Sequence, residues 1–163
     1  MDEKNYDPEL PEIRRTAVRG IVWYNGKMLL IKSKFGEVKL PGGGIEDGES
    51  DIAALIREVR EETGFEVIPE SAVPFGYVEE KRLSRREPMI WHQFSRLYFC
   101  DVRDVHGTSN FTEREKNAGM HLVAMTLEEA IENNRRMMGK EGVQPYNRRE
   151  LNTFLLIKKR MMD

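Results

Sequence analysis

The chain has 163 residues, of which 39% are hydrophobic and 33% are charged. This length supports one adequate core and leaves little for a second, so we expect a single domain over residues 1–163, with residues 1–12 as a polar N-terminal extension. The net charge of -2, from 26 basic and 28 acidic residues, argues against general nucleic-acid binding and against an anionic membrane surface as partner.

The sequence also bears on compartment. No segment approaches the roughly twenty apolar residues of a membrane span, and the first residues lack the apolar stretch of an export signal. The single cysteine, Cys100, ends an apolar run and fits a buried thiol better than half of a disulfide. We therefore expect a cytoplasmic protein without membrane association.

The first predicted element is a β-hairpin. Residues 16–24 alternate loosely between apolar and polar, Asn25-Gly26 is a strong signal for a type I′ turn, and residues 27–33 supply the return strand. Further strands are predicted at residues 66–68, 75–80, 89–102 and 120–125, and the polar residues 104–116 are predicted to form a loop.

Three helices are predicted. The first covers residues 50–63, where Ser50 is a good N-cap and Gly64 suits a left-handed C-cap. The second opens at a capping box formed by Thr126 and Glu129 and runs to about residue 135. The third opens at residue 147, with residue 150 as the matching acid, and runs to about residue 161.

The helix at residues 50–63 presents acidic side chains on one face. Glu58, Glu61 and Glu62 stand at i, i+3 and i+4, so they share a face and repel one another. A solvated amphipathic helix would explain an isolated pattern of this kind. Clustered carboxylate oxygens are also the ligands of a hard divalent cation, and the preceding glycines permit close approach of a ligand to the backbone.

Residues 43–65, GGIEDGESDIAALIREVREETGF, match the pattern G-x5-E-x7-R-E-U-x-E-E-x-G-U, in which U is apolar, at every position. This segment resembles the Nudix box, and a chance match is on the order of one in several million. The order of elements from about residue 13 to about residue 160 also resembles the Nudix fold. The expected class is therefore α+β, with a mixed β-sheet sandwiched between α-helices.

The resemblance implies an enzyme that depends on Mg2+, or on Mn2+, and cuts the pyrophosphate linkage of a nucleoside diphosphate derivative. By position in the motif, the metal ligands would be Glu58, Glu61 and Glu62, with the Gly42 carbonyl as a helper. Such ions stabilise charge on phosphate oxygens and make a nucleophile of bound water.

Other residues receive supporting roles from the same resemblance. Arg57 would orient the glutamates through charge-assisted pairs, and Glu49 would lie at the edge of the metal site, acting through water. The backbone of Gly43 and Gly44 would contact substrate phosphates.

The general base is left open between two sources. Relatives draw it either from the box or from a glutamate in a loop elsewhere, and the loop candidates here are Glu113 and Glu115. A solvated polar loop explains the same two residues equally well. Glu79 and Glu80 are weaker alternatives, because paired glutamates at a strand end are usually exposed.

Contacts to the rest of the substrate are predicted from aromatic and basic residues. Trp91 could serve as a planar platform for a base, although a strand tryptophan is more often part of the core. Arg82, in the basic run of residues 81–86, could hold a phosphate, whereas a solvated hairpin tip is the simpler explanation. The arginine pairs at residues 135–136 and 148–149 are expected to be solvated.

The substrate stays open, because residue patterns that mark subfamilies of known specificity are absent. Our first hypothesis is a nucleoside triphosphate, normal or oxidised, cut to the monophosphate and pyrophosphate. The alternatives are ADP-ribose, a nucleotide sugar or a dinucleotide, and, in another class, a non-catalytic nucleotide-sensing module. The expected partner is this small nucleotide, and a homodimer is the expected assembly.

Overall fold

The computed structural model describes residues 1–105 and 107–163. Its described strands are β1 (Glu12–Tyr24), β2 (Lys27–Lys32), β3 (Val38–Lys39), β4 (Gly42–Gly44), β5 (Phe65–Val67), β6 (Val73–Leu83), β7 (Ile90–Cys100), β8 (Val102–Asp104) and β9 (His121–Met125). The helices are α1 (Asp51–Thr63), α2 (Glu113–Asn117), α3 (Leu127–Met137) and α4 (Asn147–Met162), with a short 3-10 helix at Pro69–Ser71.

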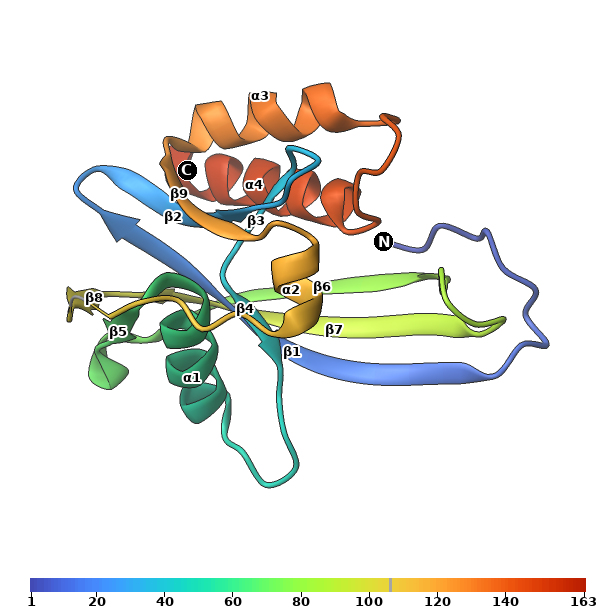
Figure 1. The fold of residues 1–163 in the computed structure, drawn as a ribbon, viewed down its shortest axis with the longest axis horizontal. Coiled ribbons are helices and arrows are strands. Elements are labelled where there is room, and N and C mark those ends of the chain that lie inside the picture. Colours follow the sequence, from blue (N-terminus) through green and yellow to red (C-terminus); the bar gives the residue numbers. More distant parts are fainter. Residues whose placement is uncertain (106) are drawn as a thin grey trace.

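The centre of the molecule is a mixed sheet. Five of its strands lie in the order β3-β2-β1-β7-β6, while β4 pairs with β1 and β9 pairs with β2 (Figure 1). Strand β1 runs parallel to β7 from the pair Glu12 and Ile90 to the pair Val22 and Cys100, and antiparallel to β2 and β4. A separate two-stranded sheet joins β5 to β8.

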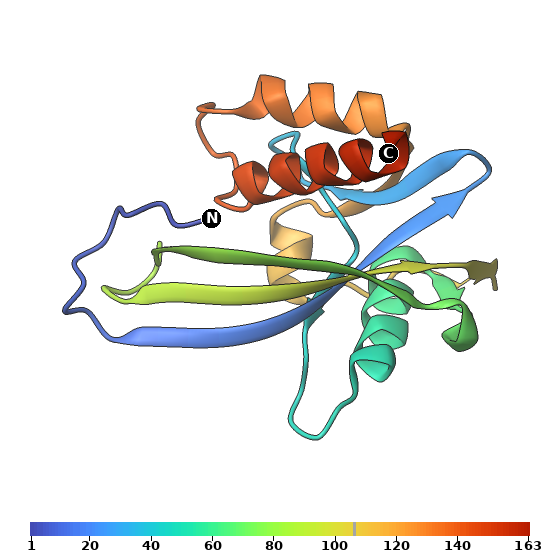
Figure 2. The same ribbon diagram turned by 180° about the vertical axis from the view of Figure 1, so that it is seen from behind.

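Helices cover both faces of the sheet. Figures 1 and 2 show α1 on one side and the pair α3 and α4 on the other. Neighbouring residues of β1 enter different cores, because successive side chains of a strand point to opposite faces. Ile21 packs with Phe154 of α4, whereas Val22 packs with Val59 of α1. The predicted α+β sandwich is confirmed.

The turn of the first hairpin has the geometry that its sequence predicts. Asn25 and Gly26 both have positive φ angles, 51° and 77°, as a type I′ turn requires. Trp23 pairs with Met28, and Tyr24 pairs with Lys27, on either side of this turn. The hairpin prediction is confirmed.

Helix α1 also begins and ends where its local sequence predicts. The Ser50 hydroxyl accepts a hydrogen bond from the Ala53 N–H at 3.1 Å, and Gly64 takes a left-handed conformation with a φ of 77°. Leu55 and Val59, on the apolar face of the helix, are fully buried against the sheet. The acidic face is therefore held toward β4.

The prediction of a continuous loop at residues 104–116 is wrong in part. Residues 113–117 form helix α2, which opens at a capping box between Thr112 and Glu115. A polar segment this short has no apolar period that would predict a helix. Residue 106 of this segment lies outside the described residues.

Two other boundaries differ from prediction. The single strand expected at residues 89–102 is divided, because the chain leaves the main sheet after Cys100 and pairs with β5. The first residue of α4 is Asn147, but its side chain does not cap the helix and instead donates to the Asn134 carbonyl at 3.0 Å. In both places, groups that were expected to make local contacts instead make hydrogen bonds to distant parts of the chain.

The polar N-terminal extension is tied to the sheet. The Glu3 N–H donates to the Lys81 carbonyl, and the Lys81 N–H donates to the Met1 carbonyl, both at 2.9 Å. This segment therefore covers the outer edge of β6. None of the helices in the two described ranges has the length and apolarity needed to cross a bilayer.

Candidate functional site

The three glycines of β4 lie where side chains would collide with neighbours. A Cβ at Gly42 would stand 2.1 Å from the Val18 carbonyl oxygen, and a Cβ at Gly43 would stand 2.5 Å from the Glu58 carboxylate. A Cβ at Gly44 would stand 2.6 Å from Arg15 Nη2. Strand β4 thus passes between an acidic and a basic group with only backbone separating them.

Arg57 organises the acidic face of α1. Its guanidinium donates to both carboxylate oxygens of Glu49 at 2.8 Å, to Glu58 Oε1 at 2.7 Å and to the Gly44 carbonyl at 3.0 Å. This pairing lowers the pKa of Glu49 to about 2, with Arg57 as the largest cause. Arg57 thus holds the Glu49 and Glu58 carboxylates on one side of α1.

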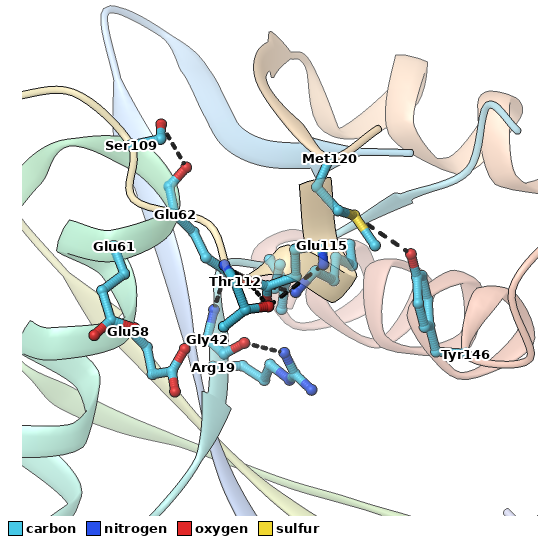
Figure 3. A network of polar contacts seen from close by, with 12 residues as sticks. Arg19, Gly42, Glu58, Glu61, Glu62, Ser109, Thr112, Glu115, Met120 and Tyr146 are labelled. Carbon is cyan, nitrogen blue, oxygen red and sulfur yellow. Dashed lines mark hydrogen bonds and ion pairs between the residues drawn. The ribbon is translucent and has the colours of Figure 1, made fainter. Parts of the chain in front are cut away.

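Glu58 and Glu61 point the same way from α1 (Figure 3). Burial first, and then the nearby Glu58 carboxylate, raise the pKa of Glu61, with Glu115 a further contributor in the same direction. Glu61 also lies 3.6 Å from the Arg57 guanidinium, and 40% of its side chain is exposed. These two carboxylates form a region of concentrated negative charge that solvent can reach.

Glu62 has different surroundings from the other two glutamates. Its residue is 1% exposed, Oε1 lies 2.5 Å from Lys39 Nζ, and Oε2 accepts from the Gly42 N–H at 2.7 Å. Burial raises the pKa of this carboxyl, while Lys39 acts in the opposite direction. Glu62 therefore joins α1 to β3 and β4, and Lys39 is a site residue that the sequence reading missed.

The structure does not bring the three motif glutamates into one ligand set. Within residues 1–105 and 107–163, no three acidic, histidine or cysteine side chains converge closely enough to hold a metal ion unaided. The Gly42 carbonyl, the fourth predicted ligand, accepts from Arg19 Nη1 at 2.5 Å. Both carboxylate oxygens of Glu62 and the Gly42 carbonyl are thus paired with a cation or an N–H of the protein itself.

Helix α2 separates the two loop candidates for a general base. Glu113 points into solvent, where its side chain is 84% exposed and pairs with Lys116 at 2.9 Å. Glu115 Oε2 accepts from the Thr112 N–H and hydroxyl, both at 2.9 Å, and Figure 3 places the residue between α1 and α4.

The segment before α2 is attached to the end of α1. The Ser109 hydroxyl donates to the Glu62 carbonyl at 3.1 Å, and the Asn110 N–H donates to the Glu61 carbonyl at 2.6 Å. These contacts hold Glu115 on the side of the α1 carboxylates, which sequence alone could not show.

Trp91 and Arg82 lie together on the face of the sheet nearest α2 and α4. The Arg82 guanidinium is 5.6 Å from the Trp91 ring centroid, and the Arg15 guanidinium is 5.5 Å from the same centroid. Arg82 also pairs with Glu80 at 3.0 Å, and its side chain is only 12% exposed. The expectation that Arg82 is part of a solvated hairpin tip is wrong.

A buried ion-pair network lies beneath this face. Arg149 donates to Glu80 at 2.9 Å and to Glu150 at 2.8 Å, and the Glu150 carboxylate also accepts from the Leu40 N–H at 2.8 Å. Glu80 is fully buried and Arg149 is 4% exposed. The expectations of an exposed Glu80 and a solvated Arg149 are therefore wrong, whereas Arg148 is exposed as predicted.

Comparison with known proteins agrees with the motif. The family model described as the NUDIX domain matches residues 14–143. An ADP-ribose pyrophosphatase of Methanocaldococcus jannaschii is 48% identical over 52 residues, which cover 29% of this chain and 31% of that protein. YjhB of Bacillus subtilis, provisionally named an ADP-ribose pyrophosphatase, is 29% identical over 94 residues, covering 57% of this chain and 44% of that protein. The chain spans less than half the length of these two relatives.

Solved structures show the same fold. A NUDIX hydrolase from Nitrosomonas europaea has a TM-score of 0.56 at 20% identity, with 90% of this chain and 91% of that chain covered. A MutT NUDIX hydrolase from Burkholderia pseudomallei has a TM-score of 0.55 at 20% identity, with coverages of 86% and 97%. Because the domain match covers most of the chain and includes the complete motif at residues 43–65, this protein belongs to the Nudix family.

Proposed function

We propose that this protein hydrolyses the diphosphate linkage of a nucleoside diphosphate derivative with the help of a divalent cation. The observation that carries the proposal is the position of Glu58 and Glu61 beside a strand without side chains. A diphosphate needs both metal-binding carboxylates and close access to backbone, and this arrangement supplies the two together.

The donor chemistry fits a hard cation such as Mg2+ or Mn2+. Glu58 and Glu61 would hold it, because they are solvent-accessible carboxylates within a few residues of each other on one helix face. Glu62 would join them only by exchanging its contact with Lys39. When bound, such an ion neutralises phosphate oxygens and lowers the pKa of a coordinated water.

The protein's own residues have separable tasks in this reaction. Arg57 holds Glu49 and Glu58 in place through hydrogen bonds of 2.7 to 2.8 Å. Gly43 and Gly44 let the diphosphate lie against β4. Glu115 accepts the proton of the attacking water, since it is the α2 carboxylate whose negative charge contributes to the raised pKa of Glu61.

The assignment of Glu115 is tested by paired variants. Glu115→Gln should lower kcat by about 100-fold or more, because the amide cannot accept the proton but still completes the capping box of α2. Glu113→Gln is the matched control and should retain near-normal kcat, since Glu113 only pairs with Lys116 at the surface. Equal rates for both variants and the parent would move the base into the motif of α1.

The role of strand β4, which has no side chains, is tested at Gly43. Gly43→Ala should lower kcat by about 100-fold, because the new Cβ displaces the Glu58 carboxylate, now 2.5 Å from that position. Its melting temperature should stay near that of the parent, since a side chain can shift. Gly42→Ala should instead unfold at lower temperature, because its Cβ meets the Val18 carbonyl and its φ is 141°. An active Gly43→Ala would count against the proposed position of the reacting group.

Two substrate classes are proposed in order. The first is a nucleoside triphosphate, normal or oxidised, which would be cut to the monophosphate and pyrophosphate. The second is ADP-ribose, favoured by the names of the two curated relatives. Nucleotide sugars and dinucleotides present the same linkage.

The deciding experiment measures products with Mg2+ across nucleoside triphosphates, oxidised nucleotides, ADP-ribose, nucleotide sugars and dinucleoside polyphosphates. Pyrophosphate release from a triphosphate supports the first class, and two monophosphate products from ADP-ribose support the second. Tight nucleotide binding without turnover of any compound would overturn the enzymatic proposal in favour of a nucleotide-sensing module.

A further inference from the structure

Several arginines near the active site have no acidic partner. The side chains of Arg15, Arg86 and Arg114 make no hydrogen bond or ion pair with other residues in the described part of the chain. Other cations of this protein do pair with a carboxylate, as Lys81 does with Glu12 at 2.9 Å. The unpaired guanidiniums therefore keep their N–H donors available for a ligand.

Two arginines from distant parts of the chain lie beside one aromatic ring. Arg15 of β1 and Arg82 of β6 reach Trp91 on the strand between them, with guanidiniums 5.5 and 5.6 Å from the ring centroid. The indole Nε1 of Trp91 is buried without a hydrogen-bond acceptor among the described residues. An anion at this point would supply the missing acceptor as well as the missing negative charge.

The arginines are close enough to affect one another. Burial is the first cause that lowers the pKa of Arg15, and the nearby Arg114 and Arg149 lower it further, while Glu58 opposes them. Burial is also the first cause that lowers the pKa of Arg114, followed by Arg86, with Arg82 a smaller contributor. Like charges held together in this way repel one another, and a bound anion would offset that repulsion.

The cluster begins at the proposed reaction centre and leads away from it. Arg15 lies against Gly44, and Arg82 forms part of the wall of a 470 Å³ cavity near the connection between β6 and β7. Arg86 lines a neighbouring cavity of 610 Å³. A group bound here would thus be joined to a diphosphate lying on β4.

We infer that Arg15, Arg82, Arg86 and Arg114 form a subsite for a phosphate group beyond the linkage that is cut. The inference rests on the proposed function and names its substrate class as a triphosphate or longer polyphosphate. The three arginines without an acidic partner match the charge of additional phosphate, and guanidinium forks match its oxygen geometry. The uncharged second ribose of ADP-ribose would leave the arginines without partners.

Binding without turnover tests the subsite directly. Tripolyphosphate and pyrophosphate would be titrated calorimetrically into the full chain with excess EDTA, so that no metal contributes. Tripolyphosphate should bind more tightly to the parent, and Arg114→Gln and Arg86→Gln should each weaken it by about tenfold. Arg136→Gln, on the exposed side of α3, is the matched control and should bind as the parent does. Equal weakening in Arg136→Gln, or none in either cluster variant, would overturn the inference.

Kinetics separate this inference from the proposed function. Arg114→Gln should raise KM for a nucleoside triphosphate by about tenfold with kcat nearly unchanged, and should leave any ADP-ribose turnover unaffected. Tripolyphosphate binding that depends on Arg114, without turnover of any substrate, would support the subsite and refute the proposed reaction. Triphosphate turnover that is indifferent to Arg114 would refute the subsite alone. Arg82 is unsuitable for this test, because its loss would also disturb the buried Glu80.

Discussion

Glu61→Gln is expected to lower turnover by roughly a thousandfold while leaving the melting temperature unchanged or slightly higher. The substitution removes a carboxylate that is proposed to bind the metal ion. It does not leave a buried cation without a partner. The Glu61 side chain is 40% exposed, and Arg57, which lies 3.6 Å from it, still pairs with Glu49 and Glu58. The substitution also relieves the repulsion between Glu61 and Glu58.

The measurement combines kcat with Mg2+ titration and thermal unfolding of the same preparation. Glu70→Gln, on the exposed 3-10 helix, is a control for loss of one negative charge elsewhere. Near-normal turnover in Glu61→Gln would show that the assignment of this carboxylate to the metal is wrong. Glu62→Gln is not an equivalent test, since it also leaves the buried Lys39 without its partner.

Arg149→Met is expected to reduce the free energy of unfolding by about 3 to 5 kcal/mol. Arg149 is 4% exposed and neutralises two carboxylates, Glu80 and Glu150, that are themselves 0% and 1% exposed. Without the guanidinium, the buried Glu150 would lose its ion-pair partner, and the buried Glu80 would keep only Arg82. The melting temperature should fall by on the order of 10 °C.

Chemical denaturation of variants measures this effect. Arg148→Met, at the exposed neighbouring position, is the matched control and should unfold like the parent. The double variant Arg149→Met with Glu150→Gln should recover part of the loss, because the carboxylate that is left without a cation has been removed. A loss no larger than that of Arg148→Met would contradict the network.

Local sequence was enough to predict the framework of the site. The type I′ turn at Asn25 and Gly26 and the caps of α1 at Ser50 and Gly64 are formed by residues within a few positions of one another. The spacing of Glu58, Glu61 and Glu62 places them on one helix face for the same reason. Family, fold and the acidic face of α1 therefore follow from short-range patterns alone.

The predictions that failed concern charged residues far apart in the chain. Glu80 and Arg149 look like surface residues in sequence, because nothing near either of them reveals a partner that is 69 positions away. Helix α2 was missed because a helix of five polar residues has no apolar period to detect. For Glu80 and Arg149 the deciding contact is made only after the sheet and helices have packed.

The sequence by itself determined that this chain is a Nudix protein with an acidic helix after a glycine-rich segment, since those properties depend on residue spacing within one segment. Only the tertiary structure decided which charges work together. It pairs Glu62 with Lys39, buries Arg149 between two carboxylates, and gathers Arg15 and Arg82 around Trp91. The physical reason is that strand register and helix docking, not local order, decide which charged side chains meet and which are withdrawn from water.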